Sequence, residues 1–324
     1  MRKIVTIGGG TGSYVVLRGL KEYPLSITAV ISMFDSGGSS GMLRDEFGIL
    51  PPGDIRRALV ALSEGKRAEI LRQLFNFRFP AGGRSSSGGE NGGALKGHSF
   101  GNLFLAALTS IYGSDIEAIR KASELLNIKG KALPVSLDNA NLHAVLEDGT
   151  EIIGETNIDI PKHDASKSIK KVFLDPPARL FDETRDAIAA ADMIVIGPGD
   201  PYTSVIPNLL VEGMREALGK SKAKKIFVCN LLSKWGETHD FVASDIAREV
   251  LAYSGLSKFD YAICNNAPME KKLVVAYEKE KKYPIVCDDM LKEFAKNVIT
   301  GDFFSEADIA RHDSAKIAKT IAEL

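Results

Sequence analysis

The residues best suited to chemistry are a run near the N-terminus, Gly8-Gly9-Gly10-Thr11-Gly12. The run follows a strand-like segment and precedes a helix-like one, which is where α/β proteins hold phosphate. Glycine lets backbone N–H groups approach phosphate oxygens closely, and a helix N-terminus adds partial positive charge. We therefore expect Gly9, Gly10, Thr11 and Gly12 to contact a phosphate group. The plainer alternative is a tight turn that needs glycine only for its backbone conformation.

A second polar cluster follows the next predicted strand, residues 27–33. Asp35 lies where a carboxylate grips the ribose of a bound dinucleotide, which keeps NAD as an alternative ligand. The dinucleotide fingerprint is incomplete, because Ser13 replaces its third glycine. Ser39 and Ser40 lie in a glycine- and serine-rich loop that adds N–H and hydroxyl donors where adenine would lie. This crowding favours a phosphorylated small molecule, either a nucleotide or a nucleotide sugar.

Two further polar residues lie near predicted helix starts. Asp54 follows a Pro-Pro-Gly segment and is suited to cap a helix that begins at Ile55. It is equally suited to orient a phosphate or a sugar hydroxyl. Asn102 stands at the start of an apolar helix, where N–H groups and an amide point at whatever lies beyond. We expect Asn102 to contact the ligand, and the nearby His98 to make a structural hydrogen bond.

A second glycine turn between a predicted strand and a predicted helix, Gly197-Pro198-Gly199, lies in the second half of the chain. Thr203 follows in the first turn of the next predicted helix. In an open parallel sheet, ligands bind outside the carboxyl ends of strands, where the strand order reverses. We expect Gly197, Gly199 and Thr203 to wall the same crevice, and Asn230, at another strand end, to contact a base or ribose. An ordinary strand-to-helix loop is the alternative.

The sequence lacks the patterns typical of known catalysts. It contains no Walker A motif, no G-x-S-x-G elbow, no Ser/His/Asp trio and no His/Cys cluster with zinc spacing. No nucleophile or general base is therefore assigned. We expect no metal site and no required cofactor.

These residues need an α/β framework to hold them. Short apolar runs alternate with amphipathic helical patterns, as in a parallel sheet covered on both faces. We predict a three-layer, Rossmann-like, doubly wound and mainly parallel sheet with helices on both faces and a small β-hairpin excursion. The expected strands are 3–7, 27–33, 169–174, 193–197, 225–231, 261–265 and 284–287. The expected helices are 13–22, 54–63, 66–76, 99–112, 115–127, 182–191, 203–218, 240–253, 269–280 and 305–323.

We expect residues 1–324 to form a single large domain with three special segments. Residues 80–97 are rich in Gly and Ser, so we predict a flexible surface loop. Residues 131–168 read as a β-rich excursion that contains a hairpin. Residues 290–324 are predicted to be a C-terminal helical segment that closes the site.

Composition narrows the partners and the location. The formal net charge is −1, so nothing calls for nucleic acid or an anionic membrane surface. The uncharged stretch 99–114 falls short of the ~20 apolar residues of a membrane span. The N-terminus leaves no room for a signal peptide, and the cysteines, Cys229, Cys264 and Cys287, form no C-x-x-C pair. We expect a cytoplasmic protein with reduced thiols.

At this point the motifs resemble a known family. The glycine loop, the Asp-Ser-Gly-Gly-Ser-Ser-Gly run of 35–41 and the Phe-Gly-Ile-Leu-Pro-Pro-Gly-Asp-Ile-Arg run of 47–56 are similar to the gluconeogenesis factor family. So are Gly-His-Ser at 97–99, the Gly-Pro-Gly turn, and Gly-Glu-Thr at 236–238. The wider CofD-like superfamily includes the 2-phospho-L-lactate transferases of coenzyme F420 synthesis. The resemblance covers essentially the whole chain and favours the gluconeogenesis factor branch.

The resemblance implies a Rossmann-like protein that binds UDP-sugars, notably UDP-N-acetylglucosamine. It implies regulation that links carbon metabolism to cell-wall precursor synthesis and cell shape, through a protein partner. Tyr277 and Arg311 match the family's sugar-nucleotide contacts. Ser36 departs from the family pattern, because a second acidic residue usually follows the position of Asp35, and a carboxylate pair that holds Mg²⁺ is not expected there.

Three hypotheses follow for the function. The first is a UDP-sugar sensor with little or no catalysis, in which residues 9–12 hold the diphosphate. Asp35 and Asn230 would read ribose or uracil, and Arg311 would meet phosphate. The second is a transferase that moves a phosphate-linked group from a nucleotide-activated donor, for which Mg²⁺ would need Asp35 and Asp54. The third is an NAD-binding oxidoreductase. Assembly into a homo-oligomer stays open.

Overall fold

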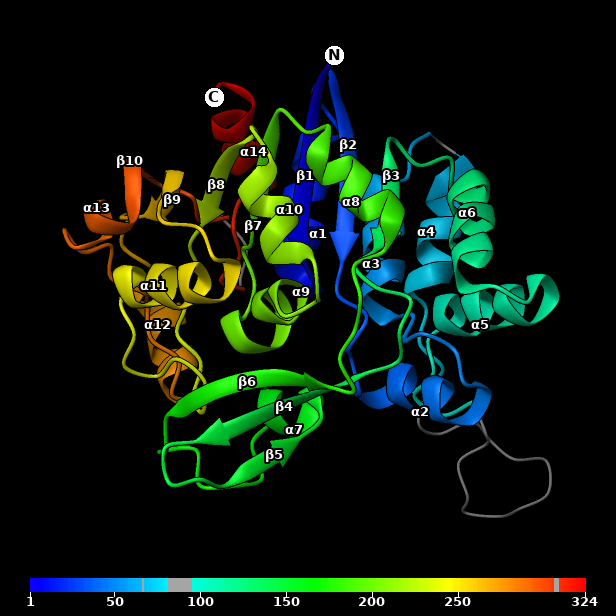
Figure 1. Cartoon of the computed structure of the whole chain (residues 1–324), viewed down its shortest axis with the longest axis horizontal. Helices are drawn as coiled ribbons and strands as arrows, with labels where there is room; N and C mark the ends of the chain where they lie inside the picture. The colour runs from blue at the N-terminus through cyan, green and yellow to red at the C-terminus, as the bar shows by residue number, and fades with distance from the viewer. Residues whose placement is uncertain (66, 81–94, 306–308) are drawn as a thin grey trace.

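The centre of the molecule is an open parallel sheet. The computed structural model describes residues 1–65, 67–80, 95–305 and 309–324. Within these residues a seven-stranded sheet has the order β10-β9-β8-β7-β1-β2-β3, with every neighbouring pair parallel (Figure 1). Its strands are β1 (Arg2–Gly8), β2 (Leu25–Ile31), β3 (Lys131–Pro134), β7 (Met193–Ile196), β8 (Lys224–Val228), β9 (Phe259–Asn265) and β10 (Ala295–Gly301).

The strand order reverses once, between β1 and β7. The chain runs outward from β1 through β2 to β3, returns to pair β7 with β1, and then builds the other half of the sheet. This is the doubly wound arrangement that the sequence predicts. Since ligands of such sheets bind where the order reverses, the turns after β1 and β7 flank the expected position.

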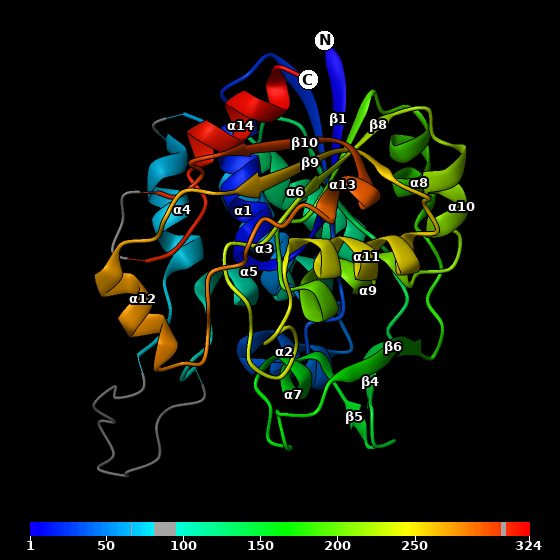
Figure 2. The ribbon, with the colours of Figure 1, turned by 90° about the vertical axis from the view of Figure 1, so that its left-hand side faces the viewer.

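Helices cover both faces, because the strands are apolar on both. Along β7, Met193 and Val195 face one hydrophobic core, and Ile194 and Ile196 face the other. Helices on the first side are α1 (Gly10–Leu20), α3 (Gly53–Leu62), α5 (Phe100–Tyr112), α6 (Asp115–Leu126) and α14 (Ser314–Ala322). Helices on the second side are α8 (Asp182–Ala189), α9 (Ile206–Leu209), α10 (Met214–Lys220), α11 (Ala243–Ser254) and α13 (Leu291–Phe294) (Figure 2).

A separate small sheet lies beyond the carboxyl ends of the parallel strands (Figure 1). It is antiparallel and consists of β4 (Asn141–Leu146), β5 (Glu151–Ile153) and β6 (Ile169–Asp175), in the order β5-β4-β6. The short helix α7 (Glu155–Asp159) follows β5 directly. The predicted hairpin is confirmed. The predicted strand 169–174 forms as well, but it joins this small sheet.

Both edges of the main sheet differ from the prediction. Residues 131–134 form β3 at one edge and so do not belong to the β-rich excursion. The segment 290–324, expected to be helical, contains β10 at the other edge. Each edge strand pairs on one side only, and β10 is half exposed, so neither needs the long apolar run of a central strand.

Other elements differ from the predicted pattern. Residues 284–287 form only an isolated bridge, between Leu232 and Pro284. The helix expected over 203–218 is divided into a π-helical turn (Pro201–Val205), α9 and α10, and Gly213, with φ +92°, precedes α10. Residues expected as loop form α2 (Gly38–Phe47), which ends at Gly48 with φ +65°.

The remaining helices are α4 (Arg67–Asn76) and α12 (Lys271–Glu278). Of the segment 80–97 predicted to be a flexible loop, residues 81–94 lie outside the described residues. Cys229, Cys264 and Cys287 are free thiols, as expected. Among the described helices, none combines the length and the apolar character needed to cross a membrane.

Candidate ligand-binding cleft

Two connected cavities open at the point where the strand order reverses. The inner chamber, about 490 Å³, is lined mainly by the glycine loop, the residues after β2, the start of α3, and α7. The outer chamber, about 620 Å³, is lined mainly by residues 230–235, by Tyr277 at the end of α12 with Glu280 and Lys282 just beyond it, and by the segment before α14. Both are lined by Thr11, Gly12, Asp159, Ile160, Gly199 and Asp200. The cleft is therefore divided into two chambers that meet at the N-terminus of α1.

Close packing explains why residues 8–12 are mostly glycine. A Cβ on Gly12 would lie 2.1 Å from the carbonyl oxygen of Pro198, and one on Gly9 would lie 2.4 Å from Oδ2 of Asp54. Gly10 has φ +64°. The loop thus needs glycine to pack against the turn after β7, and it still lines both chambers.

The turn after β7 contributes to the cleft unequally. Gly199 and Thr203 line the inner chamber, as predicted for a second wall. Gly197 lines neither chamber. Its φ of +76° is a backbone conformation that glycine adopts readily, so glycine is needed there to form the turn.

A buried polar network forms one end of the inner chamber. The Ser39 hydroxyl is 3.1 Å from Nδ1 of His98, and it accepts a hydrogen bond of 3.1 Å from Nδ2 of Asn102. Asn102 also approaches the Ser40 hydroxyl at 3.5 Å and accepts a bond of 2.9 Å from Nε of Arg56. Hydrogen bonds thus join polar groups that are far apart in sequence, and all of them except His98 line the inner chamber.

Asp54 does not cap its own helix. Because α3 begins at Gly53, Asp54 lies in the first turn, where its carboxylate accepts the backbone N–H of Gly10 and pairs with Arg57 at 3.3 Å. Burial raises the pKa of Asp54 to about 6, the nearby Asp35 carboxylate acts in the same direction, and Arg57 opposes both. The N-cap interpretation is wrong, and Asp54 instead faces the glycine loop.

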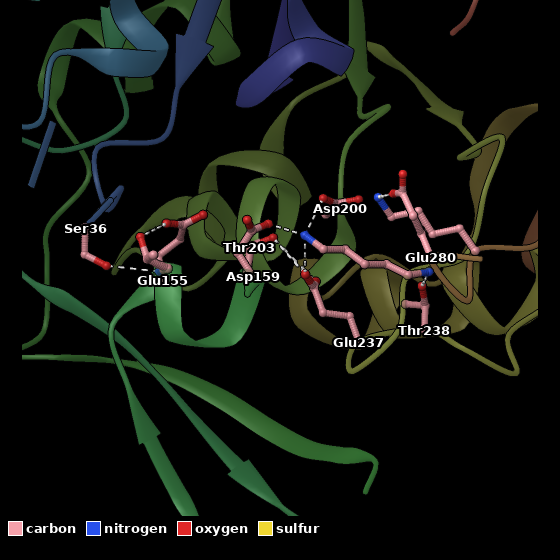
Figure 3. A network of polar contacts seen from close by, with 11 residues as sticks. Ser36, Glu155, Asp159, Asp200, Thr203, Glu237, Thr238 and Glu280 are labelled. Atoms are coloured by element: carbon pink, nitrogen blue, oxygen red, sulfur yellow. Dashed lines mark hydrogen bonds and ion pairs between the residues drawn. The ribbon is translucent and has the colours of Figure 1, made fainter. Parts of the chain in front are cut away.

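Several residues of the inner chamber carry no signal in the sequence. Glu155, Thr156 and Asp159 come from α7, whose position depends on how the small sheet docks. The Ser36 hydroxyl accepts the Thr156 N–H at 3.0 Å, so the residue that departs from the family pattern anchors α7 (Figure 3). Burial raises the pKa of Glu155 to about 9, and the carboxylates of Asp35, Asp159 and Asp54 act in the same direction. The basic residues Arg56, Arg57 and Arg78 also line this chamber.

The outer chamber is lined by amide, aromatic and basic side chains. Asn230, Tyr277 and Arg311 all line it, as does the half-buried Trp235. The Tyr277 hydroxyl accepts the Ala310 N–H at 3.1 Å, which ties α12 to the segment that carries Arg311. The two residues that resemble family contacts are therefore neighbours on one wall.

A partly buried charge cluster forms the partition between the chambers. Nζ of Lys234 contacts Asp159, lies 2.8 Å from Asp200 and 3.0 Å from Glu237 (Figure 3). Glu237 is fully buried and accepts a bond of 3.2 Å from the Thr203 hydroxyl. Burial alone would lower the pKa of Lys234, but the carboxylates of Glu237, Asp200 and Asp159 raise it above its ordinary value. Burial raises the pKa of Glu237 to about 7 in spite of Lys234.

Fold and cleft together define a class, the Rossmann-like α/β proteins whose ligand site lies at the carboxyl ends of the strands beside the reversal of strand order. The family model for CofD, described as 2-phospho-L-lactate transferase, matches residues 4–304. The chain is 44% identical to the gluconeogenesis factor of Halalkalibacterium halodurans, over 99% of this chain and 96% of that protein. It therefore belongs to the CofD family and, within it, to the gluconeogenesis factors, as the motifs predict.

Two further similarities agree with this. The gluconeogenesis factor of Bacillus subtilis is 40% identical over 99% of this chain and 98% of its own length. The crystal structure of a Bacillus halodurans protein, 43% identical, has a TM-score of 0.91 and covers 99% of both chains.

Proposed function

We propose that this protein binds a UDP-sugar, UDP-N-acetylglucosamine, in the cleft and acts as a regulatory protein. The observation that carries the proposal is the division of the cleft into two chambers that meet at Thr11 and Gly12. A nucleotide sugar has the same three-part order, with a diphosphate between a nucleoside and a sugar. The helix N-terminus at the junction suits the diphosphate.

Each chamber suits one end of such a ligand. Trp235 and Asn230 in the outer chamber offer an aromatic face and an amide for a base, and Arg311 offers a guanidinium for phosphate. The inner chamber offers hydroxyl, amide and carboxyl groups, among them Ser39, Asn102 and Asp35, which match the hydroxyls of a sugar ring. Asp35 and Asn230 line different chambers, so this proposal gives Asp35 to the sugar instead of to ribose or uracil. The proposed ligand therefore points its uracil outward and its sugar inward.

The regulatory role rests on membership of the gluconeogenesis factors. It would link carbon metabolism to cell-wall precursor synthesis and cell shape from the cytoplasm, through a protein partner that responds to the bound state. The sequence supplies no nucleophile or base of a known catalytic pattern, which favours sensing over catalysis.

Thermal unfolding tests the ligand. UDP-N-acetylglucosamine, UDP, GDP and NAD are each added with and without Mg²⁺. A ligand that binds only the folded state stabilises it by ~2.7 kcal/mol at one hundred times its dissociation constant. We expect a rise in Tm that is specific to the UDP-sugar and absent from Arg311→Ala.

The matched control is Arg248→Ala, an exposed arginine on α11, which should respond like the unchanged protein. A rise with NAD alone would contradict the proposal. So would an equal response of Arg311→Ala and Arg248→Ala.

A second function has its own supporting observation. The inner chamber brings together the carboxyl groups of Asp35, Asp54 and Glu155, and the chain matches a family model described as a transferase. A transferase that uses a nucleotide-activated, phosphate-linked donor would show metal-dependent turnover on a panel of donors and acceptors. Turnover lost in Asp54→Asn, with a rise in Tm only for GDP and Mg²⁺, would establish this alternative.

A further inference from the structure

We propose that Lys234 is a built-in cation, which places at the junction of the two chambers the positive charge that a divalent metal ion often supplies to a bound diphosphate. The identity of the diphosphate ligand rests on the proposed function above. The replacement of a metal ion by the ammonium group rests on the structure of the partition itself.

Three acidic side chains meet at the partition between the chambers. Asp159, Asp200 and Glu237 each offer a carboxylate oxygen, and these oxygens lie within 4.8 Å of one another. They come from α7, from the residue before the π-helical turn, and from the loop after β8. Three carboxylates at such distances form an oxygen cluster of the kind that holds Mg²⁺ or Mn²⁺.

The ammonium group of Lys234 lies among these oxygens. Nζ of Lys234 is within ion-pair distance of all three carboxylates, and only 14% of the Lys234 side chain is exposed. An ammonium group has three donors, which matches three acceptors. Lys234 therefore takes the position that a divalent ion would take in the same cluster.

The cluster lies where the two chambers meet, which is the proposed position of the diphosphate. Asp159 and Asp200 line both chambers next to Thr11 and Gly12, and Lys234 lines the outer one. Without a cation, the carboxylates would repel a diphosphate at this junction. Asp200 is 38% exposed whereas Glu237 is fully buried, so an incoming phosphate would share Lys234 by displacing Asp200 and would leave Asp159 and Glu237 in place.

This arrangement predicts that the unchanged protein binds the diphosphate ligand without a metal ion. Once the ammonium group is removed, binding of that ligand should require a metal ion. Lys234→Met keeps much of the aliphatic stem and deletes the charge, which leaves three carboxylates open to a divalent ion. Lys234→Met/Glu237→Gln also removes the most buried carboxylate, so it leaves one ligand fewer and less uncompensated charge. Lys296→Met is the control, an exposed lysine that pairs with Asp260 away from the cleft.

The first measurement uses Mn²⁺ alone and needs no nucleotide. Free Mn²⁺ is followed by its electron paramagnetic resonance signal during titration of each folded variant. We expect Lys234→Met to bind one Mn²⁺ at least tenfold more tightly than the unchanged protein, Lys296→Met or the double variant. Mn²⁺ binding that is equal in the unchanged protein and Lys234→Met would overturn the proposal.

The second measurement is calorimetric titration with UDP-N-acetylglucosamine in EDTA and in Mn²⁺. The unchanged protein should bind equally in both. Lys234→Met should lose at least tenfold in EDTA and recover in Mn²⁺, and the double variant should stay weak in both. Undiminished binding by Lys234→Met in EDTA, or a metal requirement of the unchanged protein, would overturn the proposal.

The two proposals fail in different ways. If the unchanged protein binds no UDP-sugar under any condition, the proposed function is wrong, and the Mn²⁺ titration still decides whether Lys234 takes the place of a metal ion. If Lys234→Met does not fold, the double variant and the metal dependence of the unchanged protein decide it.

Discussion

Glu155 lies in the inner chamber with its carboxyl group largely removed from water and surrounded by other acids. Its pKa is raised to about 9, first by burial and then by Asp35, Asp159 and Asp54. The free energy of folding therefore depends on pH through this residue. Because the folded-state pKa lies above the unfolded value of about 4.5, folding takes up a proton between these two values, and stability falls as the pH rises through that window.

We expect Glu155→Gln to remove this pH dependence. The amide mimics the protonated acid, so the variant should match the unchanged protein near pH 4.5 and exceed its unfolding free energy by roughly 2–3 kcal/mol at pH 7. Urea unfolding at a series of pH values measures this. The exposed Glu293→Gln on α13 is the control, and a variant whose stability falls as steeply with pH as that of the control would disprove the assignment.

Helices α1 and α14 show how elements position residues of the cleft. They cross closely at Gly19, where a Cβ would lie 2.0 Å from the carbonyl oxygen of Ser314 and 2.7 Å from Cβ of Ala318. The segment that carries Arg311 leads directly into α14. The α1–α14 crossing is therefore one of the contacts that set the distance between the glycine loop and Arg311.

Gly19→Ala should separate the two helices. We expect a loss of about 1–3 kcal/mol in unfolding free energy, because overpacking forces backbone shifts, together with weaker UDP-sugar binding. Gly219→Ala in α10 is the matched control, since a Cβ there meets nothing within 4 Å. That control should gain about 0.5–1 kcal/mol, and urea unfolding of both variants gives the comparison.

The whole molecule consists of a rigid sheet with a small sheet docked below its carboxyl ends (Figure 1). The docking contacts include the bond from Thr156 to Ser36 and the pair between Asp159 and Lys234. Both lie beside the cleft. Ligand binding and the docking of α7 are therefore expected to stabilise each other.

Hydrogen exchange measures this coupling. Saturating UDP-N-acetylglucosamine should slow exchange of the α7 amides at least severalfold. The amides of β10, at the far edge of the main sheet, should exchange unchanged. Equal protection of both segments would indicate general stabilisation, and unchanged exchange in α7 would contradict the coupling.

Much of the fold follows from local sequence. β1, β2, β7, β8 and β9 are predicted because buried parallel strands need nearly continuous apolar runs. The edge strands β3 and β10 are missed, since β3 reads Lys-Ala-Leu-Pro without a continuous apolar run and β10 is half exposed. The glycine turns after β1 and β7 are also found, because a tight turn beside a strand end leaves a local signature of glycine and proline.

The residues of the cleft, like the strands, include some that local sequence predicts and some that it does not. Glycines, Asp35 and Asn102 stand at strand or helix ends, and the sequence places those ends at one edge of a parallel sheet. Glu155, Asp159 and Lys234 carry no such local signal, since their meeting depends on where the small sheet docks and on which strands become neighbours. Local backbone preferences therefore determined the glycine loop, whereas long-range packing alone decided which charges line the two chambers.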